Sequence, residues 1–271
     1  MQSQQELNER NARFWDELCG TSFAHALGIT GTEPDALERY DAAYLDYYPY
    51  LAGYVDRFDL RDEPVLEIGL GYGTLGGYLV AAGADYHGLD ISDGPVQMMR
   101  HRLHLAGVSD GDDRVVRGSA LEIPHPDGTF SYVYTIGCLH HTGDVAGSVR
   151  EVARVLKPGG KAVVMLYNRH SFRQLVRVDL QRLTPGGRRR SAQAVRALYD
   201  TNQAGDAAPH TDYLSVRGAR RVFSGFRSVH VDRHNFDDVI RHGEIIVARR
   251  RILGTPLERL LGLDLYIVAE E

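Results

Sequence analysis

The stretch that decides the fold is Pro64-Val-Leu-Glu-Ile-Gly-Leu-Gly-Tyr-Gly73. Residues 64–68 form a short, mostly apolar run that is typical of a buried strand, and the glycines after it indicate a turn. Glycine has no Cβ and tolerates positive φ, so the chain can turn sharply there and a ligand can approach its backbone. A helix is predicted over residues 74–82, and its first amides would point toward that ligand. The stretch therefore predicts a strand, a ligand-binding loop and a helix.

The alternation of strands and helices continues along the chain. Strands that alternate with helices at this spacing need crossover connections, which predicts an α/β fold around a mostly parallel sheet. The last two strands are separated by a long connection, and this pattern suits a reversed final strand at the sheet edge. The further strands are predicted at residues 85–90, 114–117, 130–135, 161–167, 228–231 and 263–269, and the further helices at 95–106, 145–156 and 215–223.

The N-terminal segment, residues 1–60, looks helical and is rich in aromatic residues. Tyr40, Tyr44 and Tyr47 are spaced at i, i+4 and i+7, which places them on one face of a helix. Pro49 is expected to end or kink that helix. We therefore predict a helical N-terminal lid over residues 1–60.

A second segment, residues 168–214, interrupts the alternation and contains the basic run Arg188-Arg189-Arg190. Its mixture of glycine, proline and arginine suits loops and short helices rather than a separate domain. The predicted second domain therefore covers residues 61–271, with a cap insertion at about 168–214.

The composition argues against several classes of protein. The net charge of −5 disfavours a nucleic-acid partner, since such domains usually carry a basic face. Cys19 and Cys138 have no metal-ligand spacing, so neither a metal site nor a disulfide framework is predicted. The polar N-terminus is not a signal peptide, and no apolar run approaches the roughly 20 residues that span a bilayer. We expect a cytoplasmic protein with no membrane partner, and leave a homodimer open.

Two nucleotide cofactors compete for the glycine loop. Asp90 ends the second predicted strand about 20 residues after the loop, where a carboxylate can accept hydrogen bonds from a ribose diol. The segment Gly71–Gly76 also matches the G-x-G-x-x-G pattern of NAD enzymes, although alone that match is weak. Glu67 stands two residues before the first glycine of an E-x-G-x-G-x-G register, and no second substrate domain follows. Both features favour S-adenosylmethionine (SAM).

Four segments in order resemble the class I SAM-dependent methyltransferases, in the bacterial branch that includes the ubiquinone/menaquinone-biosynthesis type. They are VLEIGLGYGTLGGYL, YHGLDIS, RGSALEIPHPDGTFSYVYTIGCLHHTGD and EVARVLKPGGKAVVMLY. The resemblance is strong over residues 60–167 and weak over 215–271. It implies a Rossmann-like, doubly wound sheet of seven strands, with SAM as the cofactor and S-adenosylhomocysteine (SAH) as its product.

The resemblance also implies which residues hold the cofactor. One departure concerns Ser119, because the family often has an aspartate there that holds the adenine amino group, and serine is shorter and neutral. Adenine contacts would then shift to the backbone of Ala120 and Leu121, or Ser119 would only cap a turn. The predicted cofactor residues are Glu67, Gly69, Leu70, Gly71, Gly73, Thr74, Asp90, Ile91, Ser119, Ala120, Leu121, Ile136 and Gly137.

The residues at the methyl acceptor are predicted from their places in the chain. His140 and His141 follow the fourth strand, whose carboxyl end faces the reaction centre in an open α/β sheet. They are the catalytic candidates, because histidine titrates near neutral pH, and a positioning role is the alternative. His140 is the first candidate for contact with cofactor or substrate, whereas His141 is expected to cap the helical region that follows. A base is needed only if the acceptor loses a proton. Trp15, Tyr44, Tyr47, His210 and Tyr213 are the candidate substrate contacts.

The predicted function is SAM-dependent methyl transfer to an O, N or C atom of a small molecule, in bacterial secondary metabolism. One alternative is a related SAM-binding enzyme that runs another reaction, such as a cyclisation. Another alternative is an RNA methyltransferase, and the basic run at residues 188–190 is the feature that favours it.

Overall fold

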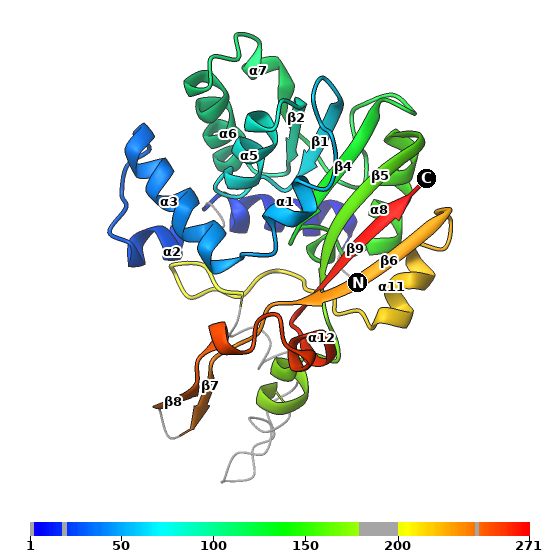
Figure 1. Cartoon of the computed structure of the whole chain (residues 1–271). Helices are drawn as coiled ribbons and strands as arrows, with labels where there is room; N and C mark the ends of the chain where they lie inside the picture. The colour runs from blue at the N-terminus through cyan, green and yellow to red at the C-terminus, as the bar shows by residue number, and fades with distance from the viewer. Residues whose placement is uncertain (1–2, 18–20, 179–199, 242–243) are drawn as a thin grey trace.

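The computed structural model describes residues 3–17, 21–178, 200–241 and 244–271. Seven strands form one sheet in the order β3-β2-β1-β4-β5-β9-β6 (Figure 1). Neighbouring strands are parallel except that β9 runs antiparallel to β5 and to β6. The predicted α/β fold with a reversed C-terminal strand is confirmed, but the reversed strand β9 lies between β5 and β6, and β6 forms the edge of the sheet. The strands are β1 (Pro64–Ile68), β2 (Asp85–Asp90), β3 (Val115–Arg117), β4 (Phe130–Ile136), β5 (Leu156–Tyr167), β6 (Ser228–His234) and β9 (Asp264–Glu270).

Helices cover both faces of this sheet. On one face α8 (Val145–Val155) and α11 (Val216–Val222) pack in a core with Leu66, Phe130 and Phe223, which are almost fully buried. On the other face α4 (Ala52–Val55), α5 (Thr74–Ala81) and α6 (Asp93–Leu105) pack on Val65 and Tyr134. Alternate residues of β1 thus enter different cores, as the pleat of a strand requires.

The N-terminal segment crosses the carboxyl end of the sheet as three further helices. They are α1 (Gln4–Trp15), α2 (Thr21–Ala26) and α3 (Pro34–Tyr47) (Figure 1). A third cluster of buried residues, among them Leu37 and Tyr40, joins α2 and α3 to Tyr72 of the glycine loop and to Met98 of α6. Helix α3 ends shortly before Pro49, as its sequence predicts. Helices α2 and α3 therefore pack directly on the glycine loop.

Two parts of the chain differ from the sequence-based expectation. β5 begins at Leu156, directly after α8, rather than at Lys161. The segment Lys157-Pro158-Gly159-Gly160 therefore lies inside the strand, where the pairing of β5 with β4 is irregular. In addition, β7 (Val239–Arg241) and β8 (Glu244–Val247) form a separate two-stranded sheet within the long connection before β9.

The short helices α7 (Gly111–Arg114) and α12 (Pro256–Leu261) complete the regular α-helices of the described residues. No helix within these residues has the length and apolar character needed to cross a bilayer.

Candidate functional site

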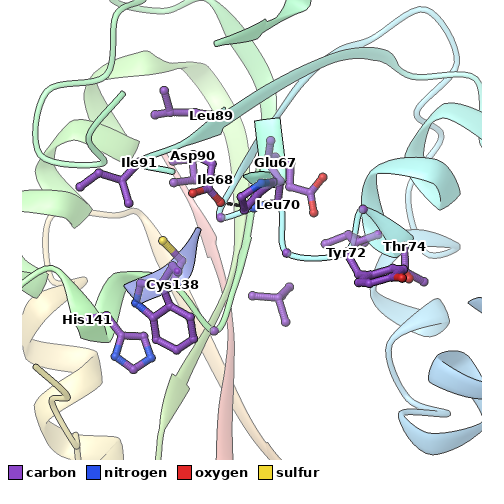
Figure 2. A pocket seen from close by; sticks show the side chains of 18 of the residues that line it. Glu67, Ile68, Leu70, Tyr72, Thr74, Leu89, Asp90, Ile91, Cys138 and His141 are labelled. Carbon is purple, nitrogen blue, oxygen red and sulfur yellow. Dashed lines mark hydrogen bonds between the residues drawn. The ribbon is translucent and has the colours of Figure 1, made fainter. Parts of the chain in front are cut away.

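A cavity of about 410 Å³ opens at the carboxyl ends of β1, β2 and β4, beneath the N-terminal helices. Figure 2 shows the glycine loop with Tyr72 and Thr74 on one side of this cavity, and Cys138 and His141 on the other. Ligands of open α/β sheets bind at this edge, because the loops that follow the strands meet there. The polar and charged residues of the wall are few, and its remaining surface is largely glycine, aromatic and aliphatic.

Asp90 ties the end of β2 to the glycine loop. Its Oδ2 accepts a hydrogen bond from the Leu70 amide at 2.8 Å (Figure 2), and its Oδ1 accepts one from the Ser92 amide at 2.9 Å. Burial raises the pKa of this carboxyl to about 6, although the two amides favour its charged form. A carboxylate still has lone pairs for further donors, so Asp90 can hold a hydroxyl pair while it fixes the loop.

Gly69 allows the close approach of β1 and the chain after β4. Its φ is +83°, in the left-handed region, and a Cβ placed there would lie 2.5 Å from Cβ of Cys138. Any other residue would therefore suffer both backbone strain and a steric clash. Cys138 lines the cavity, and no feature of the sequence marks it as more than a small apolar residue.

Gly69→Ala should destabilise the protein by about 2–5 kcal/mol, because the left-handed cost and overpacking add. Gly159→Ala is the matched control, since Gly159 has φ +78° and a Cβ on it would meet no atom within 4 Å. It should cost only about 1–2 kcal/mol. Urea unfolding measures both, and equal losses would contradict the proposed clash with Cys138.

Glu67 is a buried carboxyl at the end of β1 and lines the cavity. Tyr86 donates a hydrogen bond to its Oε2 at 2.6 Å. Burial nevertheless raises the pKa of Glu67 to about 8, because the bond from Tyr86 only partly offsets the loss of water. A cation brought beside this group would favour its charged form, so the site suits a positively charged ligand.

His141 belongs to a short 3-10 helix, η1 (Leu139–His141), that follows β4. Its Nδ1 lies 2.7 Å from the carbonyl oxygen of His210, which can only accept, so Nδ1 carries the proton and donates it. Burial lowers the pKa of His141, which favours the neutral ring. The tautomer then leaves Nε2 with a lone pair, and among the described residues Nε2 makes no hydrogen bond. Trp15 packs on the ring with centroids 4.7 Å apart.

The expectation that His140 rather than His141 faces the reaction centre is wrong, because His140 does not line the cavity and His141 does. His140 is fully buried, and its ring packs on Tyr167 with centroids 4.0 Å apart. Burial lowers the pKa of His140 well below its usual value, so the ring is neutral. Successive residues of η1 face different directions, and therefore only His141 lines the cavity.

Aromatic side chains form much of the wall of the cavity. Tyr44 and Tyr47, predicted from their helical spacing, line the cavity from α3, and Trp15 lines it from α1. The wall includes no lysine or arginine among the described residues. Tyr72 of the glycine loop and Phe23 also line the cavity, and the place of Phe23 in the sequence does not mark it as a ligand contact. The aromatic lining residues are Trp15, Phe23, Tyr40, Tyr44, Tyr47, Tyr48 and Tyr72.

The structure brings most of the predicted cofactor residues together. Leu121 does not line the cavity, because its amide donates to Ser119 Oγ at 3.2 Å and so closes a turn. His210 and Tyr213 also lie off the wall: His210 faces Asp212 at 3.1 Å, and Tyr213 packs near Tyr167. Residues 188–190 and Cys19 lie outside the described residues. The predicted cofactor residues that line the cavity are Glu67, Gly69, Leu70, Gly71, Gly73, Thr74, Asp90, Ile91, Ser119, Ala120, Ile136 and Gly137.

Comparison with known proteins identifies the central part of the chain. Residues 66–164 match a family model described as "Methyltransferase domain". These residues therefore belong to a methyltransferase domain, and over this part the chain is similar to class I SAM-dependent methyltransferases. The Fatty-acid O-methyltransferase of Mycolicibacterium smegmatis is 33% identical over 136 residues, which cover 49% of this chain and 46% of the relative. The 27-O-demethylrifamycin SV methyltransferase of Amycolatopsis mediterranei is 37% identical over 150 residues, which cover 54% and 51%.

The chain thus spans about half the length of these two curated relatives. The Ubiquinone biosynthesis O-methyltransferase of Thiobacillus denitrificans is 29% identical over 163 residues, which cover 59% of this chain and 69% of the relative. Among solved structures, a SAM-dependent methyltransferase from Thermotoga maritima has a TM-score of 0.52 at 17% identity, covering 85% of this chain and 97% of that one. The PH0226 protein from Pyrococcus horikoshii has a TM-score of 0.54 at 17% identity, covering 89% and 94%. These two likenesses show the fold of the methyltransferase domain.

The residues of the methyltransferase domain fit SAM as its cofactor. The Asp90 carboxylate suits the ribose diol, and the glycines of the loop leave room for a ligand against their backbone. Glu67 offers a buried carboxylate to a cation. When bound, SAM supplies an electrophilic methyl group on a positively charged sulfur.

Proposed function

We propose that this chain transfers the methyl group of SAM to a hydroxyl of a small, uncharged molecule with an aromatic or apolar body. The observation that carries the proposal is one continuous cavity that is lined at one end by the glycine loop and Asp90, and at the other by His141 and aromatic side chains. In this proposal residues 61–271 hold the cofactor, and residues 1–60 form the lid over the acceptor.

His141 supports a hydroxyl acceptor in particular. A hydroxyl must lose its proton as its oxygen bonds to the methyl carbon, and Nε2 of His141 can take that proton. The His210 carbonyl holds the tautomer in which Nε2 is the basic nitrogen. His141 thus leaves the reaction protonated and passes the proton to water after the products separate.

The lining supports an acceptor without a formal negative charge. A carboxylate or phosphate in a closed cavity needs a cationic partner, because an unpaired buried charge is costly. Among the described residues the wall has no lysine or arginine, while Glu67 and Asp90 belong to the cofactor end. Aromatic rings instead offer broad apolar surfaces against which a planar molecule can stack.

We also propose that the reaction belongs to bacterial secondary metabolism. The similarity to a methyltransferase whose name contains 27-O-demethylrifamycin supports this context. It directs the choice of acceptors toward hydroxylated aromatic natural products.

The function is tested by incubating the full chain with SAM and a panel of phenols, aliphatic alcohols, amines and carboxylic acids. We expect SAH to form with uncharged phenols or alcohols, together with a product that carries one additional methyl group. SAH formation only with carboxylic acids, or conversion of an acceptor without loss of the methyl group from SAM, would contradict the proposal.

Cofactor binding should release a proton from Glu67. Near pH 7 this carboxyl is mostly protonated, since its pKa of about 8 lies above the solution pH. The cationic amino-acid part of SAM would lower that pKa, so binding drives the proton off. Calorimetry of SAM binding in buffers with different ionisation enthalpies should show this release. Glu67→Gln, which has no such proton, should bind with an enthalpy that no longer depends on the buffer.

A further inference from the structure

Helix α3 is joined to α6 by a two-point ion pair. Asp41 of α3 accepts hydrogen bonds from Arg102 of α6, at 2.8 Å to Oδ2 and 2.9 Å to Oδ1. The side chain of Arg102 is only 7% exposed and that of Asp41 is 28% exposed. Two parallel bonds between a guanidinium and a carboxylate fix orientation as well as distance. The lid helix is therefore held in one position relative to α6.

The same two side chains also bind the cofactor loop. A further Arg102 donor, Nε, bonds to the carbonyl oxygen of Tyr72 at 2.8 Å. The Thr74 hydroxyl donates to Asp41 Oδ1 at 2.6 Å. Tyr72 and Thr74 bracket Gly73, where a Cβ would lie 2.6 Å from Cδ of Arg102. The end of the glycine loop is thus enclosed between the lid and α6.

Aromatic packing supports this contact. The ring of Tyr40, next to Asp41, stacks on the ring of Tyr72 with centroids 4.0 Å apart and planes 21° apart. Tyr40 is fully buried. Farther along α3, Tyr44 and Tyr47 line the cavity. One rigid helix therefore contacts the cofactor loop at one point and forms the acceptor wall at others.

We propose that Asp41 and Arg102 are positioning residues that couple the lid to the cofactor loop. This inference rests on the proposed function, because it concerns how the cofactor end of that cavity is coupled to its acceptor end. Cofactor that orders residues 71–74 stabilises the docked position of α3, and docked α3 in turn strengthens cofactor binding, because such coupling is reciprocal. The docked helix then presents Tyr44 and Tyr47 to the acceptor.

Asp41→Asn tests this coupling with little change of size. The amide can accept only one of the two guanidinium bonds and turns an N–H group toward the other donor. We expect SAH affinity to fall roughly 10-fold, within the usual range of coupling between sites. Asp46→Asn is the matched control, because Asp46 is exposed on the same helix. It should bind SAH like the wild type.

Hydrogen exchange reports the coupling directly. In the wild type, SAH should protect both residues 71–77 and the amides of α3, whereas in Asp41→Asn it should protect only the loop. A structural defect alone would raise exchange in α3 with and without SAH, but it would leave the affinity for SAH unchanged.

The inference is overturned if SAH leaves wild-type α3 unprotected, a result that does not depend on the folding of any variant. It is also overturned if Asp41→Asn binds SAH as tightly as the wild type, and methyl transfer by that variant would show that the proposed function survives. Failure of the wild type to bind SAH would overturn the proposed function itself.

Discussion

Asp90→Ala should weaken SAM binding about 100-fold. The variant loses the charge-assisted bond that holds the Leu70 amide, and it also loses the proposed acceptor for the ribose diol. Each bond to a charged group is worth about 1.5–3 kcal/mol, and tenfold in affinity corresponds to about 1.4 kcal/mol. The loss of both corresponds to about 3–6 kcal/mol, and the 100-fold effect is the lower end of this range. Titration calorimetry with SAH measures it without the acceptor.

Asp93→Ala provides the control for loss of one negative charge close to Asp90. Asp93 is exposed and pairs with Arg117 at the surface, where ion pairs contribute little. Its SAH affinity should stay near that of the wild type. If Asp90→Ala also stays there while remaining folded, the cofactor site is placed wrongly.

His141→Gln should lower kcat by about 10²–10⁴-fold, which is the usual contribution of a general base. Glutamine has a similar size and keeps a donor for the His210 carbonyl, but it cannot take up a proton. SAH affinity should change little, because the proposed role lies in the chemical step. Single-turnover rates at saturating SAM, with an acceptor found in the panel, measure the loss.

His210→Gln is the matched control for His141→Gln. Its carbonyl, rather than its ring, holds His141, and the substitution leaves the carbonyl in place. It should therefore retain most of the activity. A comparable loss of kcat in both variants would contradict the assignment of the base to His141.

The pH dependence of kcat gives a second check on His141. A base must be neutral to act, so kcat should fall as the pH drops through the pKa of His141 in the complex. Burial lowers that pKa, which places the acid limb below about pH 6.5 and the plateau near neutrality. His141→Gln should lose this limb together with most of its rate. A limb that remains in the variant would assign the titration to another group.

Much of the cofactor end could be predicted from sequence because it depends on local pattern. The glycine loop needs positive φ at Gly69, and Asp90 must end the adjacent strand to reach Leu70. Both requirements are visible in the sequence, as a glycine after the first strand and an aspartate at the end of the second. The same is true of Tyr44 and Tyr47, whose separation along one helix places them on one face.

The remaining parts of the site depend on contacts between distant segments. Nothing in the pattern of residues pairs Asp41 with Arg102, since 61 positions separate them. The preference for His140 over His141 is wrong for the same kind of reason, because the choice depends on the direction of each side chain in η1. The pairing of β7 with β8 has only a weak local signal, because the apolar runs Val239-Ile240 and Ile245-Ile246-Val247 are too short to distinguish paired strands from an irregular connection.

The place of β9 has a consequence for how the protein is made. This strand pairs along its whole length with β5 on one side and β6 on the other, yet it follows both in the chain. During synthesis β5 and β6 therefore emerge with no neighbour between them, and the unpaired edge of β5 is open to other chains. Residues up to 270 must be synthesised before β9 can pair with β5 and β6 and complete the sheet. We expect nascent chains that stall before β9 to depend on chaperones, even though the whole cofactor-loop region has already been translated.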